Sequence, residues 1–159
     1  MKTHSPSHST ASGMYGRLVL MVILSFVAMY VLMYAMVDRF ENVYMNVNQV
    51  YMAGLMAAPM AAIELAVMAG MYPNRRLNTA VALGSVAALV LFWTLIRQQA
   101  AVFDGQFLRS MIPHHAGAIL MCEEAPLRNP DLQALCKTII TDQQREIDQM
   151  KAMLSALDR

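Results

Sequence analysis

The chain has 159 residues, of which 57% are hydrophobic and only 14% are charged, a composition too apolar for an ordinary soluble domain. Its formal net charge of +1 supplies no basic field for attracting phosphates, which argues against a nucleic-acid partner. Methionine is unusually abundant, with 16 copies, and its thioether is both a flexible apolar filler and a soft metal ligand.

The first segment, residues 1–16, is rich in Ser, Thr and Gly and shows no apolar periodicity. We expect it to form a disordered cytoplasmic tail. It contains His4 and His8, but nothing in the surrounding sequence organises the two imidazoles into a metal site.

Three apolar segments follow, and each is close to the ~20 residues with which an α-helix crosses a bilayer. The predicted spans are 18–37, 50–72 and 79–96, within a membrane domain over 17–97. A cleaved signal peptide is the rival interpretation of the first span. Its apolar stretch is longer than the usual limit of ~15 residues, however, and no A-x-A cleavage site follows it.

The positions of Lys and Arg in the short loops predict the orientation of these spans. Lys2 and Arg17 precede the first span, and Arg75 and Arg76 lie between the second and the third. The connection 38–49 carries one Arg, which acidic neighbours balance. We therefore expect a multi-pass protein of the bacterial inner membrane, with a cytoplasmic amino terminus and a periplasmic carboxy-terminal domain.

The second span carries a carboxylate, Glu64, in a row of methionines at intervals of four residues. The row consists of Met52, Met56, Met60 and Met68. A ladder of soft ligands is one interpretation, and ordinary contact with lipid and neighbouring helices is the other. A carboxylate within the bilayer is costly and usually faces a helix bundle or a cavity. Pro59 should kink the span and open space beside Glu64.

From residue 98 onward the sequence is amphipathic and predicts a two-helix hairpin over 98–159. The first helix should span 104–125, where Pro126 ends it. The second helix should span 130–157, with Asn129 as its amino-terminal cap and a proline at its first position.

Both predicted helices carry apolar residues at spacings of three and four, which we take as their buried faces. On the first helix these are Phe107, Met111, Ala118, Met121 and Cys122. On the second they are Leu132, Leu135, Cys136, Ile139, Ile140, Ile147, Met150, Leu154 and Leu157. Polar side chains interrupt both faces, namely His114, His115 and Gln143.

Folding the hairpin at the midpoint of its loop places Met111 opposite Gln143 and the two histidines opposite Ile140. Glu146 then lies one turn further along. Leaving such polar groups buried and unpaired would cost about 1 to 3 kcal/mol each, so they either satisfy one another or hold a ligand. A thioether and two imidazoles within one helical turn favour Cu(I), with Ag(I) as its mimic, over Mg, Ca or Mn. Zn is possible through the imidazoles but uses Met poorly. The competing interpretation is a buried histidine pair that is hydrogen-bonded to Gln143 and Glu146.

Two motifs, M-I-P-H-H from Met111 to His115 and Q-x-x-E-I-x-x-M from Gln143 to Met150, together resemble the family called domain of unknown function 305. The resemblance covers roughly the last third of the chain. It implies a ferritin-like helical fold, an extracytoplasmic location and, in some members, copper or silver binding in metal resistance. It implies ligand roles for Met111, His114, His115, Met121, Gln143, Glu146 and Met150. The spans resemble those of a membrane-bound subgroup.

The two cysteines, Cys122 and Cys136, should lie about a turn apart along the hairpin. A disulfide, a second Cu(I) site with thiolate ligands, and two small buried thiols are all compatible with this spacing. We favour the two buried thiols.

The hairpin cannot enclose a core by itself, because two helices leave their apolar faces uncovered. We expect two copies to pair into a four-helix bundle, which makes the protein a homo-oligomer.

These observations predict an all-α membrane-anchored protein that binds copper, or silver, outside the cytoplasm for buffering, resistance or delivery. A copper exporter or chaperone would be its partner, beside the lipid bilayer. One alternative is a structural membrane subunit without metal. Another is a copper-dependent oxidoreductase, but the hairpin lacks the E-x-x-H pairs of di-iron bundles and any nucleotide or flavin motif. We expect no enzymatic activity.

Overall fold

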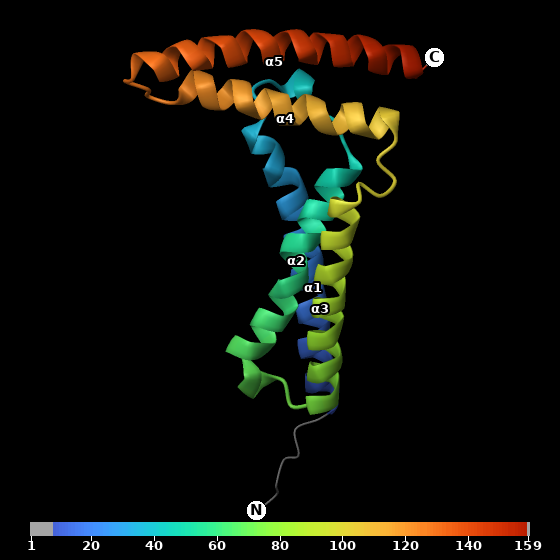
Figure 1. The fold of residues 1–159 in the computed structure, drawn as a ribbon. Helices are drawn as coiled ribbons and strands as arrows, with labels where there is room; N and C mark the ends of the chain where they lie inside the picture. Colours follow the sequence, from blue (N-terminus) through green and yellow to red (C-terminus); the bar gives the residue numbers. More distant parts are fainter. Residues whose placement is uncertain (1–7, 159) are drawn as a thin grey trace, which may run out of the picture. The chain divides into compact units, whose positions relative to one another are not determined.

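A computed structural model describes residues 8–158, with side chains from residue 13 onward. The described chain contains five α-helices, three short 3-10 helices and no strand (Figure 1). The α-helices are α1 (His8–Leu32), α2 (Val47–Val67), α3 (Arg75–Arg97), α4 (Asp104–Glu124) and α5 (Pro130–Leu157). The 3-10 helices are η1 (Met33–Met36), η2 (Phe40–Asn42) and η3 (Ala69–Met71). The prediction of an all-α protein is confirmed.

The chain divides into two compact units. The first unit comprises the residues up to Tyr30 together with Tyr51–Gln98, and the second comprises Val31–Val50 together with the residues from Gln99 on. The boundary at Gln98 coincides with the expected start of the hairpin domain. Residues 31–50 group with α4 and α5, although the sequence analysis assigned 31–37 to the first span and 38–49 to a loop.

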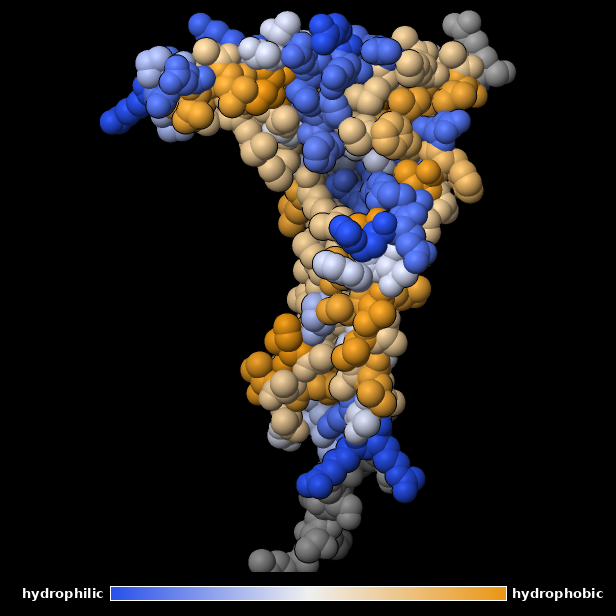
Figure 2. All heavy atoms as spheres, in the orientation of Figure 1, coloured by the Kyte–Doolittle hydropathy of each residue, from blue (hydrophilic) through white to orange (hydrophobic). Residues whose placement is uncertain are grey.

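Three helices are long and apolar enough to cross a membrane: Gly13–Met36, Val47–Val67 and Arg75–Arg97, with mean hydropathies of 2.5, 1.7 and 2.2. Their surfaces are largely apolar (Figure 2), and residues such as Leu24, which is 59% exposed, point outward. Within the first unit, Gly54 allows α2 and α3 to pack closely, because an added Cβ at this position would clash with the Phe92 ring of α3.

The second of these helices differs from the predicted span. It ends at Val67 instead of Tyr72, because the chain turns through η3 before α3 begins. Glu64 therefore lies in the last turn of α2 and not in the middle of a span. Met52, Met56 and Met68 are each exposed by about two fifths, which favours outward contacts over a continuous internal ladder.

The prediction of a disordered tail over 1–16 is wrong for residues 8–16, because α1 already begins at His8. Tyr15 explains part of this order. Its ring lies 5.2 Å from that of Tyr72, and its hydroxyl donates to Asn78 Oδ1 at 2.6 Å. His4 lies outside the described residues.

The boundaries of α4 and α5 agree closely with the predicted ones. Helix α4 runs over Asp104–Glu124, and α5 begins at Pro130. The Asn129 side chain accepts hydrogen bonds from the backbone amides of Asp131, at 2.8 Å, and Leu132, at 3.2 Å. The predicted amino-terminal cap is therefore confirmed.

The core of the second unit lies between these two helices. It consists of Leu108, Ile112, Ala116 and Ile119 of α4 and Ile147, Met150 and Leu154 of α5. The predicted buried face of α4 is thus wrong by one position, since Phe107 and Met121 are 50% and 56% exposed. The larger side chains suggested the wrong face, whereas the true face includes the small residue Ala116. On α5, the predicted residues Leu132, Leu135 and Leu157 are also exposed.

The connection between the first two apolar helices covers part of α4. Val37 and Tyr44 pack against the core, and the Tyr34 hydroxyl donates to the Tyr44 carbonyl at 2.8 Å. At Gly117 of α4, an added Cβ would lie 3.3 Å from the Met36 carbonyl oxygen. The apolar face of α4 is therefore partly covered within one chain.

Candidate metal centre

His115 is the best-defined polar residue of the second unit. It is only 8% exposed, and both ring nitrogens have partners. Nδ1 lies 2.9 Å from the Met111 carbonyl oxygen, and Nε2 lies 2.8 Å from Glu146 Oε2. The imidazole thus joins one turn of α4 to the facing turn of α5.

The partners of His115 fix the orientation of its ring. The Met111 carbonyl only accepts, so Nδ1 must carry a hydrogen. Nε2 faces the Glu146 carboxylate across their 2.8 Å contact. The Glu146 side chain is 46% exposed, so this contact has one side open to solvent. A cation that reaches Nε2 must replace this contact with Glu146.

Three contacts establish how α4 and α5 align. His115 meets Glu146, Cys122 is bonded to Cys136, and Arg109 pairs with Asp158 at 3.2 Å. The predicted alignment, with the histidines opposite Ile140, is therefore wrong by more than a helical turn. The reason is the extended connection after α4, which runs beside the first turn of α5, where Gln133 Nε2 donates to the Leu127 carbonyl at 2.8 Å.

This alignment brings two methionine residues level with each other. Met111 precedes His115 by four residues on α4, and Met150 follows Glu146 by four on the antiparallel helix α5, so both pairs lie on adjacent turns. Met150 is 9% exposed within the core, and Met111 packs against the same core. Met111, His115, Glu146 and Met150 therefore form one four-residue cluster, which we call the hairpin cluster.

The other predicted ligands lie outside this cluster. His114 is exposed, with its ring centroid 6.1 Å from that of His115. Met121 is 56% exposed. Gln143 is half-buried, and no hydrogen bond joins it to either histidine among the described residues. The expected pairing of Met111 with Gln143 is wrong, and of the two histidines it is His115 that faces α5.

The donor types of the hairpin cluster restrict the metals it fits. Among the described residues, no group of three or more His, Cys, Asp and Glu side chains is placed to hold a metal ion. A site here must therefore draw on thioethers, which suit Cu(I) better than Zn, Mg or Ca. One imidazole, two thioethers and a carboxylate fit a soft monovalent cation.

Binding would require a small movement in this cluster. A metal–nitrogen bond is about 2 Å long, so no ion fits between Nε2 and Oε2 at their separation of 2.8 Å. Glu146 is the residue free to move, because its side chain is half-exposed whereas that of His115 is 10% exposed.

The two cysteines form a disulfide, Cys122–Cys136, with their Cα atoms 5.2 Å apart. The expectation of two buried thiols is therefore wrong. The misaligned hairpin had placed the cysteines a turn apart, whereas the observed alignment brings them level. While bridged, they offer no thiolate to a metal.

Sequence reasoning overlooked the contribution of residues 31–50 to this unit. One signal was available, because Gly117 interrupts a helix, and a conformationally costly glycine there often marks a close backbone approach. The approaching backbone is that of Met36.

Comparisons with known proteins bear on the chain as a whole. The family model described as Domain of unknown function (DUF305) matches residues 35–154. The match begins in the connection before α2 and extends well beyond the last third of the chain that carries the motifs. The "Uncharacterized protein L153" of Acanthamoeba polyphaga mimivirus is 31% identical over 140 residues, which cover 86% of this chain and 90% of that protein. No solved structure matches.

Proposed function

This chain belongs to the family described as domain of unknown function 305, and we propose that it is a membrane-anchored protein that binds a soft metal cation outside the cytoplasm. Cu(I) is the proposed ion and Ag(I) its mimic. The observation that carries the proposal is the hairpin cluster, in which His115 and Glu146 meet at 2.8 Å beside Met111 and Met150.

Each residue of the hairpin cluster has a distinct part in binding. Nε2 of His115 binds the cation after Glu146 swings toward solvent, and the hydrogen bond from Nδ1 to the Met111 carbonyl keeps the ring oriented. Met111 and Met150 supply thioethers from opposite helices. Glu146 balances the added positive charge.

Two observations support an extracytoplasmic location of the hairpin, and the membrane that we propose for it is a bacterial inner membrane. The arginines of the connection between α2 and α3 favour the cytoplasmic side for that connection. The disulfide Cys122–Cys136 is of a kind that persists in oxidising compartments and is rare in the cytosol. A site in this position suits buffering, resistance or delivery of metal to an exporter or chaperone.

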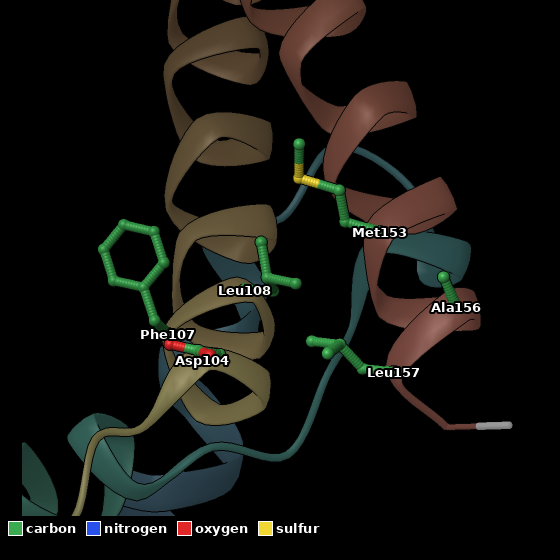
Figure 3. Close-up of a pocket in the computed structure, with 6 residues that line it drawn as sticks. All are labelled: Asp104, Phe107, Leu108, Met153, Ala156 and Leu157. Atoms are coloured by element: carbon green, nitrogen blue, oxygen red, sulfur yellow. The ribbon is translucent and has the colours of Figure 1, made fainter.

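We further propose that two copies pair through the open end of the α4–α5 pair, where they complete a ferritin-like four-helix bundle. A groove of about 520 Å³ lies there, lined by Asp104, Phe107, Leu108, Met153, Ala156 and Leu157. Figure 3 shows Leu108, Met153 and Leu157 directed into the space between the helices, with Phe107 on the outer side of α4. A second copy carries the same groove, so a twofold contact covers both apolar surfaces.

Metal binding by the detergent-solubilised full-length chain tests the proposal. Cu(I) affinity is measured by titration against a chromophoric chelator. We expect the wild type to bind Cu(I) and His115→Gln to have an affinity about 10-fold to 100-fold lower. The exposed His114→Gln is the matched control and should bind nearly as well as the wild type.

Equal and negligible uptake of Cu(I) by the wild type and His115→Gln would exclude copper binding at this site. That outcome would favour the structural membrane subunit. Circular dichroism of each variant establishes that a loss of binding does not arise from unfolding.

A further inference from the structure

A second cavity with metal-binding side chains lies in the first unit. Its volume is about 210 Å³, and Met14, Arg17, Met21, Glu64, Met71 and Tyr72 line it. None of these residues belongs to the hairpin cluster. Methionine can fill an apolar helix interface by itself, but three methionines that share a cavity with a carboxylate exceed what such filling requires.

The polar wall of this cavity is held in place by several contacts. The Tyr72 hydroxyl donates to Glu64 Oε1 at 3.4 Å, and the Tyr72 carbonyl accepts from Asn78 Nδ2 at 2.9 Å. Tyr15 packs against Tyr72 with ring centroids 5.2 Å apart, and its hydroxyl donates to Asn78 Oδ1 at 2.6 Å. These contacts tie α1, the end of α2 and the start of α3 together around the cavity.

The three sulfur donors come from two elements, α1 and η3. Met14 and Met21 lie two turns apart on one face of α1, on either side of Leu18, which is 4% exposed. Met71 comes from η3, directly after α2. Their thioethers are neutral, soft donors that favour Cu(I) or Ag(I) over Na, Mg or Ca.

The electrostatics of the cavity favour a cation. Glu64 lies in the last turn of α2, where the helix dipole is negative and a carboxylate is unfavourable unless positive charge is close. Arg17 lines the same cavity and supplies such charge, but among the described residues no ion pair joins it to Glu64.

We propose that this cavity binds a soft monovalent cation through the thioethers of Met14, Met21 and Met71, with Glu64 as its counter-charge. The cation lies beside Glu64, with which Arg17 forms no ion pair among the described residues, and the exposed arginine turns toward solvent. The inference rests on the first unit alone and does not depend on the hairpin cluster.

The experiment uses Ag(I) and the full-length chain in detergent. In one background, His115→Gln, Met111→Leu and Met150→Leu remove the hairpin cluster, and calorimetry then counts the remaining ions. We expect one bound Ag(I) per chain. Adding Met14→Leu, Met21→Leu and Met71→Leu should abolish it. The matched control adds Met29→Leu, Met52→Leu and Met56→Leu, which lie outside the cavity, and should retain the ion.

A second measurement keeps the test independent of folding. X-ray absorption of Ag(I) in the background protein should show a sulfur shell, and Glu64→Gln should weaken binding by about 10-fold while preserving that shell. Equal Ag(I) binding by the cavity and control variants, or a first shell without sulfur, would overturn the proposal. If the wild type and the background protein bind the same number of Ag(I) ions, the hairpin-cluster proposal is wrong and the cavity proposal stands. If the wild type binds one Ag(I) and the background protein binds none, the cavity proposal is wrong.

Discussion

His115 illustrates how a polar side chain can occupy an apolar helix face without a large penalty. Both of its ring nitrogens are hydrogen-bonded, so burial leaves no orphaned group of the kind that costs about 1 to 3 kcal/mol. His115 is therefore stable on this face without a metal. A metal can bind there only by replacing the existing contact between His115 and Glu146. A cation must bind His115 and Glu146 more favourably than these two side chains bind each other.

At Gly117 two residue-scale effects oppose each other. Alanine is favoured over glycine in a helix by about 1 kcal/mol, but an added Cβ would lie 3.3 Å from the Met36 carbonyl oxygen. We expect Gly117→Ala to leave the free energy of unfolding nearly unchanged and Gly117→Val to lower it by about 1 to 3 kcal/mol. Chemical unfolding in detergent measures both.

Gly105 provides the control for this pair, because a Cβ there would meet nothing within 4 Å. Gly105→Ala should stabilise the chain by up to about 1 kcal/mol. A Gly117→Val variant as stable as the wild type would show that residues 31–50 do not pack on α4 as described.

The disulfide is the strongest constraint on how α4 and α5 pack against each other. Cys122 and Cys136 are 14 positions apart in sequence, and closing a loop of about 15 residues is worth about 3 kcal/mol in the chain-entropy description. The ion pair Arg109–Asp158 adds little, since its side chains are 37% and 58% exposed.

We therefore expect Cys122→Ser with Cys136→Ser to lower the free energy of unfolding by about 2 to 3 kcal/mol. Cu(I) affinity should change little, because the disulfide lies outside the hairpin cluster. Denaturant titration measures the stability, and reduced wild-type protein is the control that should match the variant. A variant as stable as the oxidised wild type would argue against the bridge.

For the whole molecule, pairing of two copies should depend on the groove at the open end of the α4–α5 pair. Met153 and Leu157 are 48% and 55% exposed there. We expect Met153→Glu with Leu157→Glu to abolish the dimer seen by crosslinking in membranes, since two carboxylates would be desolvated on each side of the contact.

Leu132 and Leu135 make the matched control, because they are similarly exposed, at 47% and 54%, near the other end of α5. Leu132→Glu with Leu135→Glu should leave the dimer intact. Only monomers in the wild type would contradict the pairing, and loss of the dimer in the control alone would place the contact elsewhere.

Features that depend on neighbouring residues in the chain could be read from the sequence. The apolar helices, the cap at Asn129 and the ends of α4 and α5 all follow from hydropathy, proline positions and capping chemistry. The residues of the hairpin cluster were also all identified, because polar and sulfur-bearing side chains are conspicuous in an apolar stripe.

Tertiary structure alone decided how those residues meet. The extended connection beside the first turn of α5 set the alignment that pairs His115 with Glu146 and Cys122 with Cys136. The rise per residue of an extended chain is about twice that of a helix, so an extended connection shifts one helix along the other. The periodicity within each helix does not reveal the size of that shift. The packing of residues 31–50 on α4 and the cavity beside Glu64 likewise arise from segments far apart in the sequence, which no local pattern joins.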